Sequence, residues 1–432
     1  MLSQYHVNGQ TLDSLDLKVL LVTNGVKVSR RVYEVFGRTH RLSPNPQTCN
    51  CLLLPDGTVV HLVDLAMHMG YVKRALSWET VRGLRYMFQL RTPFSLELAG
   101  SGQPVLLWKG QEVTRVAFPP ASRFYQQKTS SGLPFLGNAV LQALDILSFQ
   151  CLWPCQYAQA GQACQFCYSG GLFERLARKG LPQPRMPSPR DVAEIARYAL
   201  LVEGAAKHIQ LTGGSTMNTE AECALVKGFL DEIDRIVGLK KIPGEILVYT
   251  TPPSNPAEVD QLFAAGADRV VCSLEVWDER LARVVTPGKF KFAGRQRFLN
   301  CLRYIAQRYG PNRACSSFVV GLEPAETYLE AARTLAAEGI VPIASLWLPF
   351  GRPVQGRMRA PGLDYYRQIK DGLARVYQIY GVVPPGSNGL NVCLCRDVWN
   401  HLGDLSGSTQ PCECSAPSVR HLTDTSQQEC RR

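Results

Sequence analysis

Four cysteines lie close together in one short stretch of the sequence, CLWPCQYAQAGQACQFCYSGG, at residues 151–171. Sulfur donors gathered on one loop favour zinc, Cu(I) or iron–sulfur clusters over hard cations. We interpret Cys155, Cys164 and Cys167 as the ligands of three irons of a [4Fe–4S] cluster. The fourth iron would stay open for a small ligand. Cys151 lies nearer the preceding strand-like segment, and we predict that it is not a ligand.

Segments with strand and helix patterns alternate from about residue 140 onward. The clearest helical segment, 188–204, has Ser188 as its N-cap and Asp191 in its first turn. Parallel strands need helical crossovers between them, so this alternation predicts an α/β fold with a partial (β/α)6 TIM-type barrel. The six predicted strands span residues 144–150, 208–214, 245–253, 269–277, 314–324 and 341–350.

The residues that could carry chemistry follow the ends of these predicted strands. The cysteine loop follows the first strand, Gly213-Gly214-Ser215 follows the second, and Glu275 lies near the end of the fourth. Active sites of (β/α) barrels lie at this carboxyl-terminal edge. A zinc-binding loop would not require this arrangement, so the coincidence favours a barrel enzyme.

We divide the chain into three parts. Residues 1–135 read as an N-terminal α+β domain, with hairpins expected at Asp56-Gly57 and Lys109-Gly110. Residues 136–355 form the barrel, and residues 356–432 form a C-terminal helix and a cysteine-rich tail.

His61 is isolated in the sequence, and we expect it to be structural. Two C-x-C pairs in the tail are candidates for a second sulfur-rich metal site, namely Cys393, Cys395, Cys412 and Cys414.

Composition and charge narrow the functional classes. Fifteen cysteines without a secretory leader indicate a reducing compartment and metal use, so we expect a cytoplasmic protein. No apolar run approaches the roughly 18 residues of a membrane span, and no membrane association is expected. The net charge of +11 is spread along the chain, without the basic–aromatic stripe that binds single-stranded nucleic acid. Nucleic acid is therefore not an expected partner.

The order and spacing of these motifs resemble those of the radical S-adenosylmethionine (SAM) superfamily, over about residues 95–355. The usual signature of that superfamily is C-x3-C-x2-C. The C-x8-C-x2-C spacing of this chain is similar to that of some branches, including elongator-like relatives. Thr286-Pro287-Gly288-Lys289 resembles a loop of the biotin-synthase-like branch, toward which the resemblance leans.

The resemblance implies roles for particular residues in binding SAM. Phe166 stands where the superfamily places an aromatic residue close to the adenine, and Gly321 lies in a segment, 318–326, that resembles another adenine-contacting motif. The Gly213-Gly214-Ser215 segment resembles a Gly-Gly-Glu motif whose backbone binds the methionine amino group. Ser273 and Glu275 resemble positions that reach the ribose or the methionine portion.

The resemblance also implies an activity. A reduced cluster would cleave SAM to a 5′-deoxyadenosyl radical, which abstracts hydrogen from a small-molecule or carrier-protein-bound substrate. A reductant such as ferredoxin or flavodoxin would supply the electron, and Arg352 is a candidate for holding a substrate carboxylate.

Two alternatives stay open at this point. A second iron–sulfur cluster in the tail would favour sulfur insertion into unactivated C–H bonds, as in biotin and lipoyl synthases. A zinc knuckle formed by C-x3-C-x8-C-x2-C would instead favour a nucleic-acid-binding protein.

Overall fold

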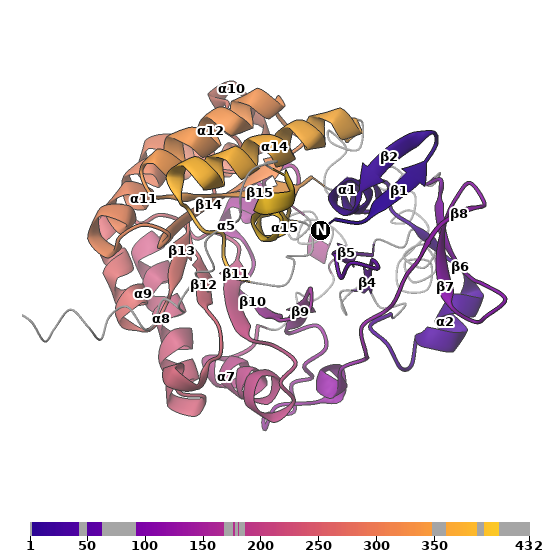
Figure 1. The fold of residues 1–432 in the computed structure, drawn as a ribbon. Helices are drawn as coiled ribbons and strands as arrows, with labels where there is room; N and C mark the ends of the chain where they lie inside the picture. Colours follow the sequence, from indigo (N-terminus) through magenta and orange to yellow (C-terminus); the bar gives the residue numbers. More distant parts are fainter. Residues whose placement is uncertain are drawn as a thin grey trace, which may run out of the picture.

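The computed structural model of the protein describes residues 2–42, 50–62, 92–167, 176–177, 180, 186–347, 360–386 and 393–405. A curved sheet wrapped by helices makes up the larger part, and a smaller N-terminal unit lies beside it (Figure 1).

A seven-stranded sheet forms the centre of the protein, with the strand order β15-β14-β13-β12-β11-β10-β9. All neighbours from β10 to β15 are parallel, whereas β9 is antiparallel to β10. The strands are β9 (Val140–Gln142), β10 (Ile146–Leu152), β11 (His208–Gly213), β12 (Ile246–Tyr249), β13 (Arg269–Val271), β14 (Ala314–Val320) and β15 (Val341–Leu346).

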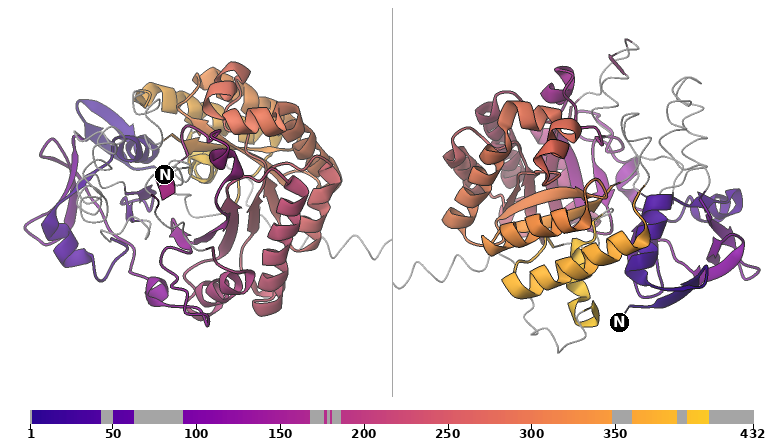
Figure 2. Two further views of the ribbon diagram at one scale, coloured as in Figure 1. Left: turned by 180° about the vertical axis from the view of Figure 1, so that it is seen from behind. Right: turned by 90° about the horizontal axis from the view of Figure 1, so that it is seen from above.

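Helices connect the parallel strands and lie on the outside of the curved sheet (Figures 1 and 2). This arrangement buries both faces of most strands, as parallel sheets require. The connecting helices are α7 (Pro189–Arg197), α8 (Thr219–Ile236), α9 (Asp260–Ala264), α10 (Glu279–Val285), α11 (Arg295–Tyr309) and α12 (Ala325–Ala337), and α14 (Leu363–Tyr380) follows the last strand.

Helix α7 begins where the sequence predicts. The Ser188 hydroxyl accepts a hydrogen bond from the Asp191 backbone N–H at 3.2 Å, and the Asp191 carboxylate accepts one from the Ser188 backbone N–H at 3.0 Å. This reciprocal pair is a capping box, and Pro189 occupies the first helical turn. The α-helix ends at Arg197 and continues as a π-helical turn, Tyr198–Val202, which together account for the predicted helical segment.

The predicted partial barrel is confirmed, although most of its strands are shorter than predicted. Strand β13 ends at Val271, and the predicted segment up to residue 277 cannot be one regular strand, because Glu275 has a φ of +72°. The antiparallel strand β9 was not predicted, because its three residues are too few to show an alternating pattern.

The N-terminal unit contains both predicted hairpins, β4 (Cys51–Leu53) with β5 (Val59–His61), and β7 (Pro104–Trp108) with β8 (Gln111–Arg115). The second hairpin belongs to a four-stranded sheet with the order β3-β6-β7-β8. The remaining elements are β1 (Gln4–Val7), β2 (Gln10–Asp13), α1 (Ser14–Asn24), β3 (Lys27–Val28), α2 (Arg30–Phe36) and β6 (Phe94–Leu98). The boundaries of the three predicted domains stay predictions.

This unit contacts both edges of the open barrel. Helix α1 contacts β15 and α14 at one edge, and it also contacts β5. At the other edge, the Arg41 guanidinium donates to the carbonyls of Leu141 and Ala143, in and just after β9. The N-terminal unit therefore lies across the gap between the two edge strands (Figure 1).

Buried ion pairs join α1 to the C-terminal part of the chain. The Lys18 ammonium lies 2.6 Å from the Asp397 carboxylate in α15 (Cys395–Asn400), and the Lys18 side chain is fully buried. Lys370 of α14 pairs with Asp13 and, at 3.0 Å, with Asp16. A short helix, α16 (Leu402–Leu405), ends the described chain.

In the part of the chain that the structure describes, no helix combines the length and apolar character of a membrane span.

We expect Lys18→Met to lower the free energy of unfolding by about 3–5 kcal/mol, because the variant leaves the Asp397 carboxylate buried without its counter-ion. Urea titration followed by circular dichroism would measure the change. The matched control is Lys227→Met, which removes an exposed pair of the same 2.6 Å length and should cost less than about 1 kcal/mol. Equal losses in the two variants would contradict this account of how α1 is held.

Candidate functional site

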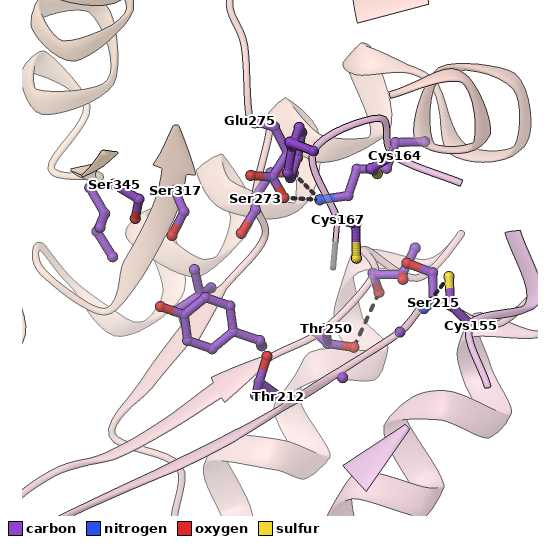
Figure 3. A pocket seen from close by; sticks show the side chains of 18 of the residues that line it. Cys155, Cys164, Cys167, Thr212, Ser215, Thr250, Ser273, Glu275, Ser317 and Ser345 are labelled. Atoms are coloured by element: carbon purple, nitrogen blue, oxygen red, sulfur yellow. Dashed lines mark hydrogen bonds and ion pairs between the residues drawn. The ribbon is translucent and has the colours of Figure 1, made fainter. Parts of the chain in front are cut away.

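The loop that carries the three cysteines begins directly after strand β10. Cys155 precedes the short helix α5 (Gln156–Gln159), and the chain then turns at Gly161, whose φ of +73° favours glycine. The Cys167 backbone N–H donates to the Cys164 carbonyl at 3.1 Å, which closes a turn around the last two cysteines. All three cysteines line one cavity of about 430 Å³ (Figure 3). The structure thus brings the predicted ligands together at the carboxyl-terminal edge of the sheet.

The glycine pair at the end of β11 packs directly against this loop. A Cβ atom on Gly214 would lie 2.5 Å from the Cα of Cys155, and one on Gly213 would lie 2.6 Å from the backbone nitrogen of Leu152. Only glycine fits at such distances. The Ser215 backbone N–H donates to the Cys155 sulfur at 3.3 Å, which ties the loop to the chain after β11.

Cys151 lies within β10, is 5% exposed and packs in the apolar core. Burial raises the pKa of its thiol, which keeps the sulfur protonated. It is not among the described residues that line the cavity. That Cys151 is not a ligand stays a prediction.

A partly buried ion pair, formed by Lys289 and Glu275, lies on the cavity wall. The Lys289 ammonium lies 2.5 Å from the Glu275 carboxylate and donates to the Ser273 carbonyl at 2.7 Å (Figure 3). Burial alone would lower the pKa of Lys289, but the Glu275 carboxylate raises it above its ordinary value. Glu275 therefore reaches the cavity with its charge already balanced.

The two residues that the resemblance assigns to the adenine differ in their surroundings. Phe166 lines the cavity and packs against an apolar cluster that includes Val276 and Trp347. Gly321, with a φ of +111°, is outside the described cavity lining, and its N–H donates to the Tyr365 hydroxyl at 2.8 Å. The structure thus brings Phe166, but not Gly321, to the cavity wall.

The tail cysteines that the structure describes pack at the edge of the sheet. Cys393 lines the cavity and pairs with Ser345 in an antiparallel bridge. The Cys395 sulfur is buried and accepts a hydrogen bond from the Ala344 backbone N–H at 2.9 Å. Cys412 and Cys414, the other half of the proposed second metal site, and Arg352 lie outside the described residues.

Several cavity-lining residues were not among the predicted site residues. His61, predicted to be structural, reaches the cavity from the N-terminal unit, and Lys289 was noted only as part of a loop. The hydroxyl-bearing residues lie within strands β11, β12, β14 and β15, and the alternation of side chains along these strands could have indicated them. The position of His61, in contrast, depends on tertiary docking. The other unpredicted lining residues include Gln142, Gln210, Thr212, Tyr249, Ser317 and Ser345.

The donor set fits a cluster better than a single ion. Among the described residues, no three cysteine, histidine or carboxylate side chains are arranged to hold one metal ion. In a [4Fe–4S] cluster each thiolate binds a different iron, and three cysteines leave one iron for another ligand. Burial raises the pKa of the Cys164 thiol, while the Lys289 ammonium opposes that rise, and metal binding would deprotonate the thiol.

Known proteins resemble this chain in sequence and fold. The family model for the radical SAM superfamily matches residues 160–339. Bacteriochlorophyllide c C-7(1)-hydroxylase of Chlorobaculum limnaeum is 22% identical over 296 residues, which cover 66% of this chain and 73% of that protein.

Among solved structures, methylornithine synthase aligns with a TM-score of 0.40 and 14% identity, covering 65% of this chain and 86% of that one. A radical SAM methyltransferase from Sphaerobacter thermophilus aligns with a TM-score of 0.37 and 15% identity, covering 73% and 81% of the two chains. The family match, on a chain whose curved parallel sheet carries a cysteine loop at its carboxyl-terminal edge, supports membership of the radical SAM superfamily.

Proposed function

We propose that this protein is a radical SAM enzyme in which Cys155, Cys164 and Cys167 hold a [4Fe–4S] cluster, and which abstracts hydrogen from a small-molecule or carrier-bound substrate. The observation that carries the proposal is the meeting of these three cysteines on one cavity beside the backbone of Gly213-Gly214-Ser215. When bound, a reduced cluster and SAM supply the one-electron chemistry that attacks an unreactive C–H bond.

The residues around the cysteines would bind and orient SAM. The backbone of Gly213–Ser215 would contact the methionine end, because these residues line the cavity next to Cys155. Ser273 and Glu275 would contact the methionine or ribose from the cavity wall that they line, and Phe166 would offer an apolar face to the adenine. Gly321 lies outside the described cavity lining, so it would affect adenine binding only by positioning neighbouring residues.

Lys289 would hold Glu275 in place for this contact. Its ammonium bridges the Glu275 side chain and the Ser273 carbonyl, so it fixes two residues of the loop after β13 at once. It also compensates the carboxylate charge in a partly buried site, where an unpaired charge is costly.

The reaction that follows hydrogen abstraction stays open. The similarity to a hydroxylase of bacteriochlorophyllide c is compatible with attack on a C–H bond, but at 22% identity it does not carry the substrate over. Sulfur insertion would need a second cluster, and two of the four cysteines that we proposed for it, Cys412 and Cys414, lie outside the described residues. We still expect a ferredoxin or flavodoxin as the reductant, membership of the biotin-synthase-like branch and a cytoplasmic location.

We expect single alanine replacements of Cys155, Cys164 or Cys167 to abolish cluster binding. Iron in the anaerobically reconstituted protein should fall from about four per chain toward zero, with loss of the broad absorption near about 400 nm and of 5′-deoxyadenosine formation. The matched control is Cys151→Ala, which removes a cysteine from the same stretch and should keep iron and turnover. Retention of iron and SAM cleavage by any of the three ligand variants would refute the assignment.

We expect Gly214→Ala to lower SAM cleavage about 10- to 100-fold, because its Cβ would overlap Cys155 and displace the cysteine loop, and a misplacement of about 1 Å can cost about 100-fold in rate. Formation of 5′-deoxyadenosine per bound cluster would measure the loss. Gly228→Ala is the control, since nothing lies within 4 Å of a Cβ at that position in α8. If both variants cleaved SAM at the wild-type rate, the close packing of Gly214 on the loop would have no functional role.

A further inference from the structure

The cysteine loop packs against an outer segment of the barrel, residues 279–293, which contains α10. The Gln165 backbone N–H, between the second and third cysteines, donates to the Val285 carbonyl at 2.8 Å. The Gly288 N–H donates to the Gln162 carbonyl at 3.1 Å. Two backbone hydrogen bonds therefore join this segment to the part of the loop that carries Cys164 and Cys167.

Helix α10 lies between the cysteine turn and an exposed face at the periphery of the molecule (Figure 1). Phe166, which stands between the last two cysteines, belongs to the same apolar cluster as one face of α10. The residues of that face are Leu281, Ala282 and Val285. The exposed residues, three and four positions apart, are Arg280, Arg283 and Val284. A helix with its side chains is about 10–12 Å across, so this exposed face lies roughly one helix diameter from the cysteine turn.

The exposed face is basic and has an apolar residue within it. We define the basic surface as Arg280, Arg283, Val284 and Lys291, the last of which belongs to the π-helical turn Lys289–Ala293. Val284 is 59% exposed, and the three cationic side chains are exposed as well. The Arg283 guanidinium lies 4.4 Å from the centroid of the Phe290 ring, which brings it next to the turn that carries Lys291.

The positive charge of this surface is not neutralised within the part of the chain that the structure describes, where its three cations form no ion pair. The neighbouring carboxylates have other partners. Asp278 accepts a hydrogen bond from the Leu281 N–H at 2.7 Å, and the Glu279 carboxylate lies 3.9 Å from the Arg295 guanidinium. Uncompensated cations around an exposed apolar side chain suit an acidic protein, because complementary charge speeds association and apolar contact forms the centre of an interface.

We infer that a small acidic electron-carrier protein docks on the basic surface and reduces the cluster from there. The inference rests on the proposed radical SAM function and adds the place where the reductant binds. In that function SAM and substrate occupy the cavity, so a protein reductant approaches the cysteine turn from outside it, and the basic surface lies on a segment packed against that turn. The carrier loses one electron, the cluster gains it, and no covalent bond forms between the two proteins.

Two reductants of different size test this inference. The reconstituted protein with SAM is reduced either by flavodoxin, supplied with its reductase and NADPH, or by reduced methyl viologen, a small cation that needs no docking surface. Arg283→Glu/Lys291→Glu should lower flavodoxin-driven formation of 5′-deoxyadenosine about tenfold or more, because like charges then face each other. Formation driven by methyl viologen should not fall below about half of the wild-type rate.

The matched control is Lys240→Glu/Lys241→Glu, which also reverses two exposed charges. These lysines precede β12 and so lie at the amino-terminal edge of the sheet, away from the cysteine loop. Neither rate should change by more than about twofold in this variant. A loss of flavodoxin-driven turnover equal to that of Arg283→Glu/Lys291→Glu would overturn the inference.

Binding is measured separately, with labelled oxidised flavodoxin and without SAM. Fluorescence anisotropy should give a Kd that rises about tenfold or more in Arg283→Glu/Lys291→Glu, and the wild-type Kd should depend more steeply on salt than that of the variant. An unchanged Kd, no binding of flavodoxin to the wild-type protein, or equal losses with both reductants would overturn the inference. Absence of 5′-deoxyadenosine with either reductant, while flavodoxin still binds at the basic surface, would instead refute the proposed function.

Discussion

The site depends on one close contact, that between the backbone of Gly214 and the backbone of Cys155. Each of the two glycines that end β11 leaves no room for a Cβ atom against the chain that ends β10. Hydrogen bonds reinforce the contact, from the Gly214 N–H to the Leu152 carbonyl at 2.7 Å and from the Gln156 N–H to the Ser215 carbonyl at 2.8 Å. The position of Cys155 is therefore fixed by the pairing of two parallel strands, and a rigid sheet holds what would otherwise be a mobile loop.

Local signals explain which features the sequence could predict. The capping box at Ser188 and Asp191, the hairpin turns of the N-terminal unit and the alternation of strands and helices each involve residues close in the chain. The cysteines and the glycine pair were predictable as a site because parallel strands bring their carboxyl ends to one edge. The contact of Lys289 with Glu275 was not predictable in this way, because a loop and a helix separate the two residues and their meeting depends on how α10 packs.

The position of His61 on the cavity depends on how the N-terminal unit docks on the barrel. His61 ends β5, and β5 contacts α1, which in turn is held to the C-terminal part by the Lys18–Asp397 and Lys370–Asp16 pairs. These pairs join residues more than 350 positions apart, and no local pattern encodes them. Buried ion pairs contribute little net stability but disfavour other arrangements of the same elements. The placement of His61 on the cavity thus follows from distant charges that orient a whole unit.

The segment after β14 shows how residues outside the cavity can still shape it. The Glu323 carboxylate accepts hydrogen bonds from the backbone N–H groups of Trp277, at 2.8 Å, and Asp278, at 3.0 Å. Burial raises the pKa of Glu323, but these donors favour its ionised form. Beside it, the Glu275 N–H donates to the Ser317 carbonyl at 2.9 Å, which helps to hold Glu275 in its left-handed backbone conformation. Strand β14 and the turn after it therefore support the loop that follows β13. A glutamate in this turn satisfies backbone N–H groups that a glycine at the same position would leave unpaired.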